Sequence, residues 1–295
     1  MSVPTQPTPT TIATAAFQLY ARRAPTSAEI TRVSDDLMEQ VKSDIMDRAV
    51  NWSFLRKIAY QPLTQYVSTY QAPADYKKLL SVRLMKGTRT GTAQTATSTT
   101  ITLAASDNGG AETAGKWIVI LSATAGSNQA LQCKTFNTST KQAVMETSWT
   151  TTPTGTIVYL VVDSFKPLTL LTNYDRNNVV HPSRQAEPDT VFHLEDTTEG
   201  DLVLDTSPDL TTYVLEETYY ADLLKMDTDT SANPLYARVL RLLNGLFIQG
   251  VYTYLCQQDS RYAIQIQKYE AKLAKTESMY LYPNNESGFH VQVDY

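Results

Sequence analysis

The sequence predicts an α+β fold: a helical bundle assembled from N- and C-terminal helices, with β excursions and an inserted small antiparallel β-sandwich or barrel. Three observations favour this fold. Apolar residues recur at helical spacing near both ends of the chain, they alternate with polar residues between those ends, and threonine gathers in a central stretch without a helical period. With 295 residues, 42% of them apolar, the chain is long enough to bury a substantial core.

The N-terminal third begins with residues 1–11, whose three prolines and lack of periodicity predict a flexible arm. A first helix is expected from Thr11 to Arg23, ended by Pro25. A second helix is expected to begin at Thr26, because Thr26 and Glu29 have the spacing of a capping box. It should continue to Asn51 along an apolar stripe made of Ile30, Val33, Leu37, Val41, Ile45 and Ala49.

The next segment changes to strand periodicity, with alternating residues from Leu63 to Tyr70 and an extended run from Leu79 to Met85. The composition shifts at Gly87, since 19 of the 41 threonines lie between Thr88 and Leu160. Short β-like runs separated by turn residues then predict an antiparallel module with its own core. The expected strands are Thr99–Ala104, Lys116–Leu121, Ala130–Phe136, Gln142–Trp149 and Thr156–Val162.

After this insertion the extended pattern resumes, and two helices follow it. Asn233 and Pro234 have the pattern of a helix start, and Asp259 is placed to cap the last helix. Gly245 and Gly250 inside the first of these helices indicate a close helix approach or a bend. The extended segments are Leu168–Asn173, Val191–Glu195, Asp201–Asp205 and Thr211–Tyr219.

These patterns predict four parts of the chain. A flexible arm covers residues 1–11, and a discontinuous domain of helical bundle plus sheet covers residues 12–86 and 167–278. The inserted β-domain covers residues 87–166, and an extended C-terminal arm covers residues 279–295. The arm is rich in large apolar groups, which are costly to leave in water. We therefore expect Tyr280, Tyr282, Phe289 and Tyr295 to dock on a neighbouring protein.

No pattern of enzyme chemistry stands out, so we expect no catalytic residue, metal or cofactor. His181, His193 and His290 lack metal-ligand spacing, and no phosphate-binding loop or nucleophile elbow is present. Cys133 and Cys256 have the apolar settings of buried residues. The net charge of −5 argues against a nucleic-acid clamp. No apolar run is long enough to cross a membrane, and no signal peptide is recognised, which predicts a protein without a membrane partner.

Two other functions stay open on specific residues. The carboxylates from Glu195 to Asp205 are candidates for a hydrolase, although clustered acidic residues in a hairpin loop more often form a solvated face. Trp117 and Trp149 are candidates for glycan contacts, which would make the threonine-rich insertion a carbohydrate- or receptor-binding tail module.

Several short motifs follow one another along the chain in a characteristic order. The motifs are Trp52-Ser53-Phe54-Leu55, Ala72-Pro73-Ala74-Asp75-Tyr76, Pro208-Asp209-Leu210-Thr211-Thr212-Tyr213, Glu217-Thr218-Tyr219-Tyr220-Ala221-Asp222-Leu223 and Gln267-Lys268-Tyr269-Glu270. Between about residues 12 and 280 this order resembles the head-to-tail adaptor of short-tailed bacteriophages. The family is also called tail tubular protein A or head-completion connector protein.

The resemblance implies a structural virion protein at the head–tail connector, present in the host cytoplasm during assembly. Such adaptors form a dodecameric ring between the portal protein and the tail nozzle protein, around the channel that DNA traverses without sequence-specific binding. The resemblance implies that the arm 279–295 reaches the portal. A negative subunit suits a channel that repels phosphate instead of gripping it.

Overall fold

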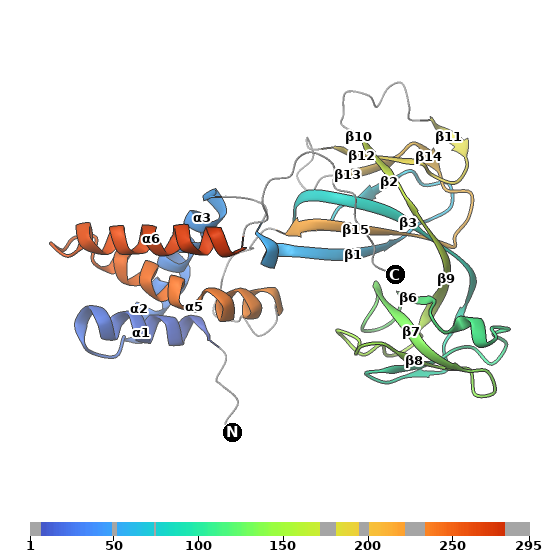
Figure 1. Ribbon diagram of the computed structural model, residues 1–295, viewed down its shortest axis with the longest axis horizontal. Helices are drawn as coiled ribbons and strands as arrows, with labels where there is room; N and C mark the ends of the chain where they lie inside the picture. Colours follow the sequence, from blue (N-terminus) through green and yellow to red (C-terminus); the bar gives the residue numbers. More distant parts are fainter. Residues whose placement is uncertain are drawn as a thin grey trace. The chain divides into compact units, whose positions relative to one another are not determined.

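The computed structural model describes residues 7–48, 52–73, 75–171, 181–194, 201–221 and 234–280 (Figure 1). The contacts within the chain divide it into two compact units. The helical unit comprises residues 1–56 and 220–295, and the β unit comprises residues 57–219.

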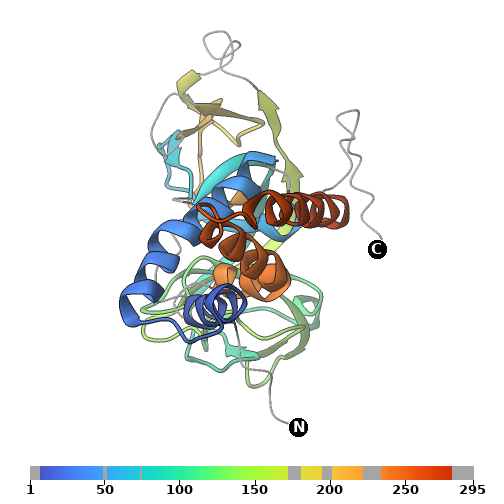
Figure 2. The ribbon, with the colours of Figure 1, turned by 90° about the vertical axis from the view of Figure 1, so that its left-hand side faces the viewer.

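The helical unit brings helices from both chain ends together. Its long helix α5 contacts α1, α3 and α6 (Figure 2). A π-helical turn, η1, joins α2 to α3, and a 3-10 turn, η2, follows α3. The bounds are α1 Pro9–Ala21, α2 Ser27–Arg32, η1 Val33–Leu37, α3 Met38–Arg48, η2 Ser53–Leu55, α5 Pro234–Leu255 and α6 Tyr262–Tyr280.

Side-chain caps set the starts of the N-terminal helices. The predicted capping box is confirmed, because the Thr26 N–H donates to Glu29 Oε2 at 2.8 Å and the Glu29 N–H donates to Thr26 Oγ1 at 3.3 Å. A second box that we did not expect pairs Thr8 with Thr11, so α1 begins at Pro9, earlier than its apolar periodicity indicated. The expected uninterrupted second helix is interrupted by η1.

Gly250 permits the close helix approach that its position in the sequence indicated. A Cβ atom placed there would lie 2.5 Å from Val41 Cγ2 on α3 and 3.0 Å from Tyr269 Cε2 on α6. No side chain larger than hydrogen fits between these neighbours, so α5 contacts both helices through its backbone.

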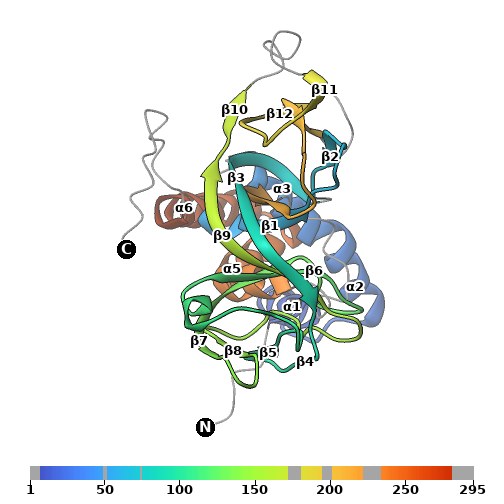
Figure 3. The same cartoon turned by 90° about the vertical axis from the view of Figure 1, so that its right-hand side faces the viewer.

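The β unit is built around a nine-stranded sheet with the strand order β1-β15-β3-β9-β6-β7-β8-β5-β4. All strand pairs from β3 through to β4 are antiparallel. Figure 3 shows β3 and β9 as the long strands of this sheet. The bounds are β1 Arg56–Pro62, β3 Tyr76–Thr92, β4 Thr95–Ala96, β5 Thr100–Thr102, β6 Trp117–Ser122, β7 Gln129–Asn137, β8 Gln142–Met145, β9 Val158–Pro167 and β15 Tyr213–Ala221.

Two smaller sheets complete the β unit. A four-stranded sheet has the order β10-β12-β13-β2, in which β10 and β12 are parallel and the other pairs antiparallel. A parallel pair is formed by β11 and β14. The bounds are β2 Thr69–Gln71, β10 Thr169–Leu171, β11 His181–Gln185, β12 Thr190–Leu194, β13 Asp201–Leu204 and β14 Thr206–Ser207.

The predicted fold class, a helical bundle with β excursions and an inserted sandwich, is wrong. The protein is mostly β, and the strands expected in a separate insertion belong to the same sheet as β1 and β15. The shift in composition at Gly87 misled the prediction, because β3 continues through it. Gly87 lies at a register shift against β9, where a Cβ would lie 2.4 Å from the Val161 carbonyl oxygen. It is therefore a bulge within a strand and not a boundary.

The expected strand from Leu63 to Tyr70 is also wrong. β1 ends at Pro62, and a turn follows in which Tyr66 adopts a left-handed conformation with φ of 68°. Alternation of apolar and polar residues occurs by chance in short segments, and proline stops the ladder at this point. The five strands expected between Thr99 and Val162 are present as β5 to β9 with shifted ends.

The central strands β6 and β9 are buried on both faces, and each face packs into its own apolar cluster. Ile118, Ile120 and Val161 belong to one apolar cluster with Trp149. Val119 and Leu160, which alternate with them, belong to a second cluster together with Met85 and Val214. An almost continuous apolar run therefore forms a strand here, as is typical of strands covered on both sides.

Candidate functional site

Tyr280, the first of the four residues predicted to dock on a portal, is the last residue of α6. Its ring meets the Phe54 ring edge-on with 5.7 Å between centroids, and Phe54 stacks on Trp52 at 5.5 Å. Tyr280 is half-buried in this aromatic group. The other three, Tyr282, Phe289 and Tyr295, lie outside the described residues, so the docking arm stays a prediction.

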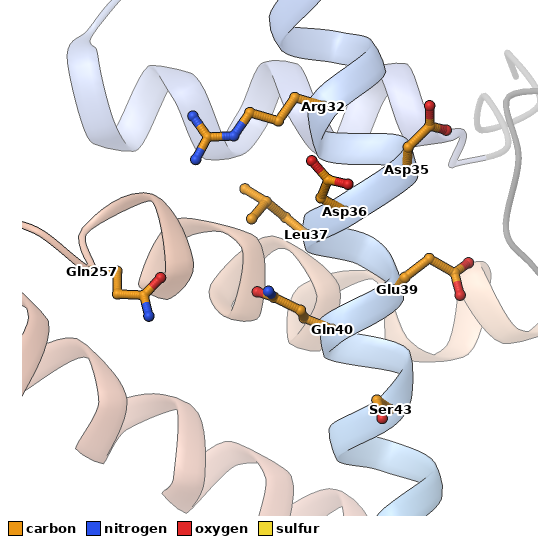
Figure 4. A pocket seen from close by; sticks show the side chains of 8 residues that line it. All are labelled: Arg32, Asp35, Asp36, Leu37, Glu39, Gln40, Ser43 and Gln257. Atoms are coloured by element: carbon orange, nitrogen blue, oxygen red, sulfur yellow. The ribbon is translucent and has the colours of Figure 1, made fainter.

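An open groove lies along α2, η1 and α3 and has a volume of about 480 Å³ (Figure 4). Figure 4 shows Arg32 and Gln40 on the side of the helix that faces Gln257, and Asp35 and Glu39 on its other side. We call it the acidic groove. It is lined by Arg32, Asp35, Asp36, Leu37, Glu39, Gln40, Ser43 and Gln257.

The charge of the acidic groove is only partly balanced. Three carboxylates against the single Arg32 leave a formal charge of −2 on its lining. Glu39 pairs with Lys42, whereas Asp35 and Asp36 are exposed and form no ion pair with another described residue. The only apolar lining residue, Leu37, is just 5% exposed.

The π turn η1 shapes the groove. The Met38 N–H donates to the Val33 carbonyl five residues earlier, which adds one residue to the turn and widens the helix. The turn buries Ser34 completely, and its hydroxyl has no hydrogen-bond partner in the part of the chain that is described. Single π turns inside α-helices are frequent at functional sites.

A second surface of the helical unit has the opposite charge. On α6 its exposed residues recur every three or four positions, along a stripe beside the buried Tyr269 and Leu273. Ile264 and Met279, at its two ends, are 58% and 62% exposed. We call this surface the basic face; it consists of Ile264, Lys268, Ala271, Lys272, Lys275 and Met279.

A half-buried carboxylate connects the helices that carry these two surfaces. Asp44 Oδ2 on α3 accepts the hydroxyl of Tyr254 at 2.6 Å and that of Tyr269 at 2.8 Å. Burial, reinforced by the Asp44 carboxylate, raises the pKa of both phenols, so both remain hydrogen-bond donors at neutral pH. These hydrogen bonds therefore fix the position of α3, which carries part of the acidic groove, relative to α6, which carries the basic face.

The β unit exposes an apolar tip made of Tyr66, Val67 and Leu210. These side chains are 58%, 38% and 50% exposed, and the Tyr66 N–H donates to the Pro208 carbonyl at 3.1 Å, which joins the two loops. A left-handed backbone at a tyrosine is strained, and such strain persists only where the surroundings impose it.

Side chains beneath the apolar tip impose that conformation. The Tyr70 hydroxyl lies 2.8 Å from the Val67 carbonyl oxygen, to which it donates. Gln65 Nε2 donates to the Asp209 carbonyl at 2.7 Å. The tip is thus a rigid protrusion, which lowers the entropy that a partner must overcome on binding.

The candidate hydrolase carboxylates are not assembled into a site in the part of the chain that is described. Asp205 Oδ1 accepts the backbone N–H groups of Asp189 at 3.1 Å and Thr190 at 3.3 Å, which is a structural role. Glu195, Asp196 and Glu199 lie outside the described residues. The described residues contain no group of three or more His, Cys, Asp or Glu side chains placed to hold a metal ion.

The two cysteines are buried, as the sequence indicated. Burial raises the pKa of the Cys133 thiol to about 11, so it is protonated at neutral pH and a poor nucleophile. His181 begins β11 and His193 lies in β12, while His290 is outside the described residues.

The tryptophans considered for glycan contacts are both packed against apolar neighbours. Trp149 is 5% exposed and belongs to a core cluster. Trp117 is half-buried, with its ring 6.3 Å from that of Phe165.

Among the described residues of the β unit, Asp107 and Glu217 are two buried carboxylates with contrasting surroundings. Arg89 Nη1 donates to Asp107 Oδ1 at 2.8 Å, and the Tyr159 hydroxyl donates to Asp107 Oδ2 at 2.7 Å. Glu217 on β15 is only 1% exposed, and neither carboxylate oxygen has a partner within the described ranges. Burial raises the pKa of Glu217 to about 8.

No known family model and no curated protein matches the chain. In the described part of the chain, no helix combines the length and the apolar character required to span a bilayer.

The apolar stripe of the second predicted helix leaves Asp35, Asp36 and Glu39 off its buried side, but it gives no sign of the groove. The apolar stripe continues through Val33 and Leu37 at ordinary helical spacing, so nothing in it signals a π turn. The basic face was readable from the spacing of Lys268, Lys272 and Lys275.

Proposed function

We propose that the protein is a structural subunit of a virion: a head-to-tail adaptor that assembles into a dodecameric ring between a portal protein and a tail nozzle protein. DNA would pass through the ring without sequence-specific binding. The proposal rests on the order of the sequence motifs and on one structural observation, which is that both units expose large apolar side chains, gathered in the β unit at the apolar tip.

Exposed apolar side chains that lie together, as at the apolar tip, are less common on a chain that acts alone than scattered ones. The β unit presents the rigid apolar tip at Tyr66, and the helical unit exposes Ile264, Met279, Leu19 and Leu242, from 38% to 62%. Large exposed apolar side chains that gather in one place mark protein contacts. A chain with separate contact surfaces on two units suits a connector, which must bind its own copies and two different neighbours.

In this proposal the apolar tip serves the tail nozzle, and the C-terminal arm serves the portal. The arm follows Tyr280, whose ring is fixed against Phe54, so it starts from a defined place on the helical unit. Ordering an arm on its partner costs part of the contact energy, which makes docking conditional on the portal being in place.

The deciding experiment is the size of the purified protein, alone and with the portal protein of the same phage. Sedimentation velocity and electron microscopy are expected to show rings many times heavier than the 32.9 kDa chain. A stable monomer at every concentration, with or without portal, would contradict the proposal. Replacing Tyr66 with Ser is expected to leave the ring intact and weaken binding of the nozzle protein.

A further inference from the structure

Two surfaces of the helical unit are complementary in charge. We propose that the basic face of α6 in one copy docks into the acidic groove of the next copy. This inference rests on the proposed ring and names the contact that joins its subunits.

The charges favour this pairing. The groove lining carries a formal charge of −2, and the basic face carries three lysines at Lys268, Lys272 and Lys275. Asp35 and Asp36 have no ion-pair partner among the described side chains, and the same holds for Lys268 and Lys275. Complementary charges speed association and penalise wrong pairings more than they add affinity. They therefore set the direction in which copies join.

The apolar residues supply the attraction that the charges do not. Ile264 and Met279 are the two most exposed large apolar side chains of the helical unit within the described ranges, at 58% and 62%. Each lies one helical turn from a lysine of the basic face. The groove offers about 480 Å³ of open volume beside the widened turn η1. An apolar side chain flanked by lysines thus enters an open space bordered by carboxylates.

The geometry also determines the kind of assembly. The groove and the basic face are different surfaces of the same unit, so a copy that uses its groove still has its basic face free. Such a heterologous contact propagates from copy to copy and ends only by closing into a ring or growing as a filament. Asp44, bonded to Tyr254 and Tyr269, fixes α3 relative to α5 and α6, so each step repeats the same angle.

Charge reversal in the full-length chain tests the contact. One variant carries Lys268→Glu and Lys275→Glu, and the other carries Asp35→Lys and Asp36→Lys. Lys272 is left unchanged, because its Nζ donates to the Gly245 carbonyl at 2.6 Å within the subunit. Each variant presents two like-charged surfaces, so the concentration for half-assembly should rise about tenfold or more. Circular dichroism and thermal melting check that both variants are folded.

Mixing the two variants provides the decisive measurement. In an equimolar mixture each groove again faces an oppositely charged α6, so sedimentation should recover assemblies of the wild-type size. A single chain with all four reversals should assemble by itself. The matched control is Lys78→Glu with Lys134→Glu, which reverses two exposed lysines of the β unit and should assemble like the wild type.

The outcomes separate this contact from the proposed function. Wild-type rings that survive both reversals overturn the contact and leave the ring standing. Folded variants that stay apart when mixed also overturn it. Filaments or dimers that depend on these charges support the contact and contradict the ring. Rings that form normally but lose the portal assign the groove to the portal and not to a second copy.

Removing the apolar ends provides an independent check. Ile264→Ser with Met279→Ser keeps every charge but should also raise the concentration for half-assembly about tenfold. Wild-type assembly should weaken between about 0.1 M and about 0.5 M salt, as paired surface charges are screened. Unchanged assembly of the serine variant would contradict the apolar part of the contact.

Discussion

Glu217 is the residue whose chemistry conflicts most with its surroundings. Its carboxyl group is buried on β15 without a partner, and its pKa is raised from 4.5 to about 8. The folded state holds the Glu217 proton more tightly than the unfolded chain does. The contribution of this proton to the free energy of unfolding is therefore fully present below about pH 4.5. It is lost as the pH rises towards 8.

Replacing Glu217 with Gln is expected to remove this pH dependence. The amide resembles the protonated acid in shape and does not ionise. Between pH 5 and pH 8 the free energy of unfolding of the variant should therefore rise relative to that of the wild type. The gain should reach a few kcal/mol. Urea unfolding at several pH values measures it. A wild type and variant whose stabilities change in parallel with pH would show that Glu217 does not titrate in this range.

Asp107 presents the opposite case, a buried carboxylate whose partners are complete. Replacing Arg89 with Met should destabilise the β unit by about 3–5 kcal/mol, because it leaves a buried charge without its countercharge. The double variant Arg89→Met with Asp107→Leu should recover much of that loss. Chemical denaturation of the three proteins gives the coupling energy. A double variant no better than the single one would refute this account.

Among the elements, α5 depends on a glycine that touches two other helices. Gly250→Ala places a methyl group 2.5 Å from Val41 Cγ2, so it should destabilise the helical unit by about 1–3 kcal/mol. Gly245→Ala is the matched control in the same helix. Its nearest neighbour is the flexible end of Lys272 at 3.1 Å, so it should stabilise by up to about 1 kcal/mol. Equal effects of the two substitutions would contradict the packing argument.

The elements also show what the sequence can predict. The capping box at Thr26 and the helix beginning at Pro234 are local features, and local features leave local signals. The nine-stranded sheet depends on pairing between residues as distant as Gly87 and Val162, which no local pattern records. The acidic groove escaped prediction for a similar reason, since η1 arises from backbone geometry that the apolar spacing does not reveal. The buried Glu217 reads as an ordinary polar residue in a strand.

For the whole molecule, the predicted arm can be tested by deletion. Removing Gly288–Tyr295 should leave the thermal stability of both units unchanged, because the proposed function gives this segment a docking role on a partner and none in either core. It should weaken binding to the portal protein at least about tenfold, as the last aromatic side chains are lost. Surface plasmon resonance on immobilised portal measures the affinity. Normal binding by the truncated chain would eliminate the arm as the docking element.

The order of strands in the large sheet has a consequence for synthesis on the ribosome. β15 lies between β1 and β3, so the sheet has a gap until residues 213–221 have been made. The N-terminal helices α1 and α3 pack against α5, which begins at Pro234. They therefore lack this packing partner until α5 has been synthesised. At about 5–20 residues per second, most of the chain spends seconds exposed before either unit can close. Nascent chains are thus expected to depend on chaperones until β15 and α5 have been made.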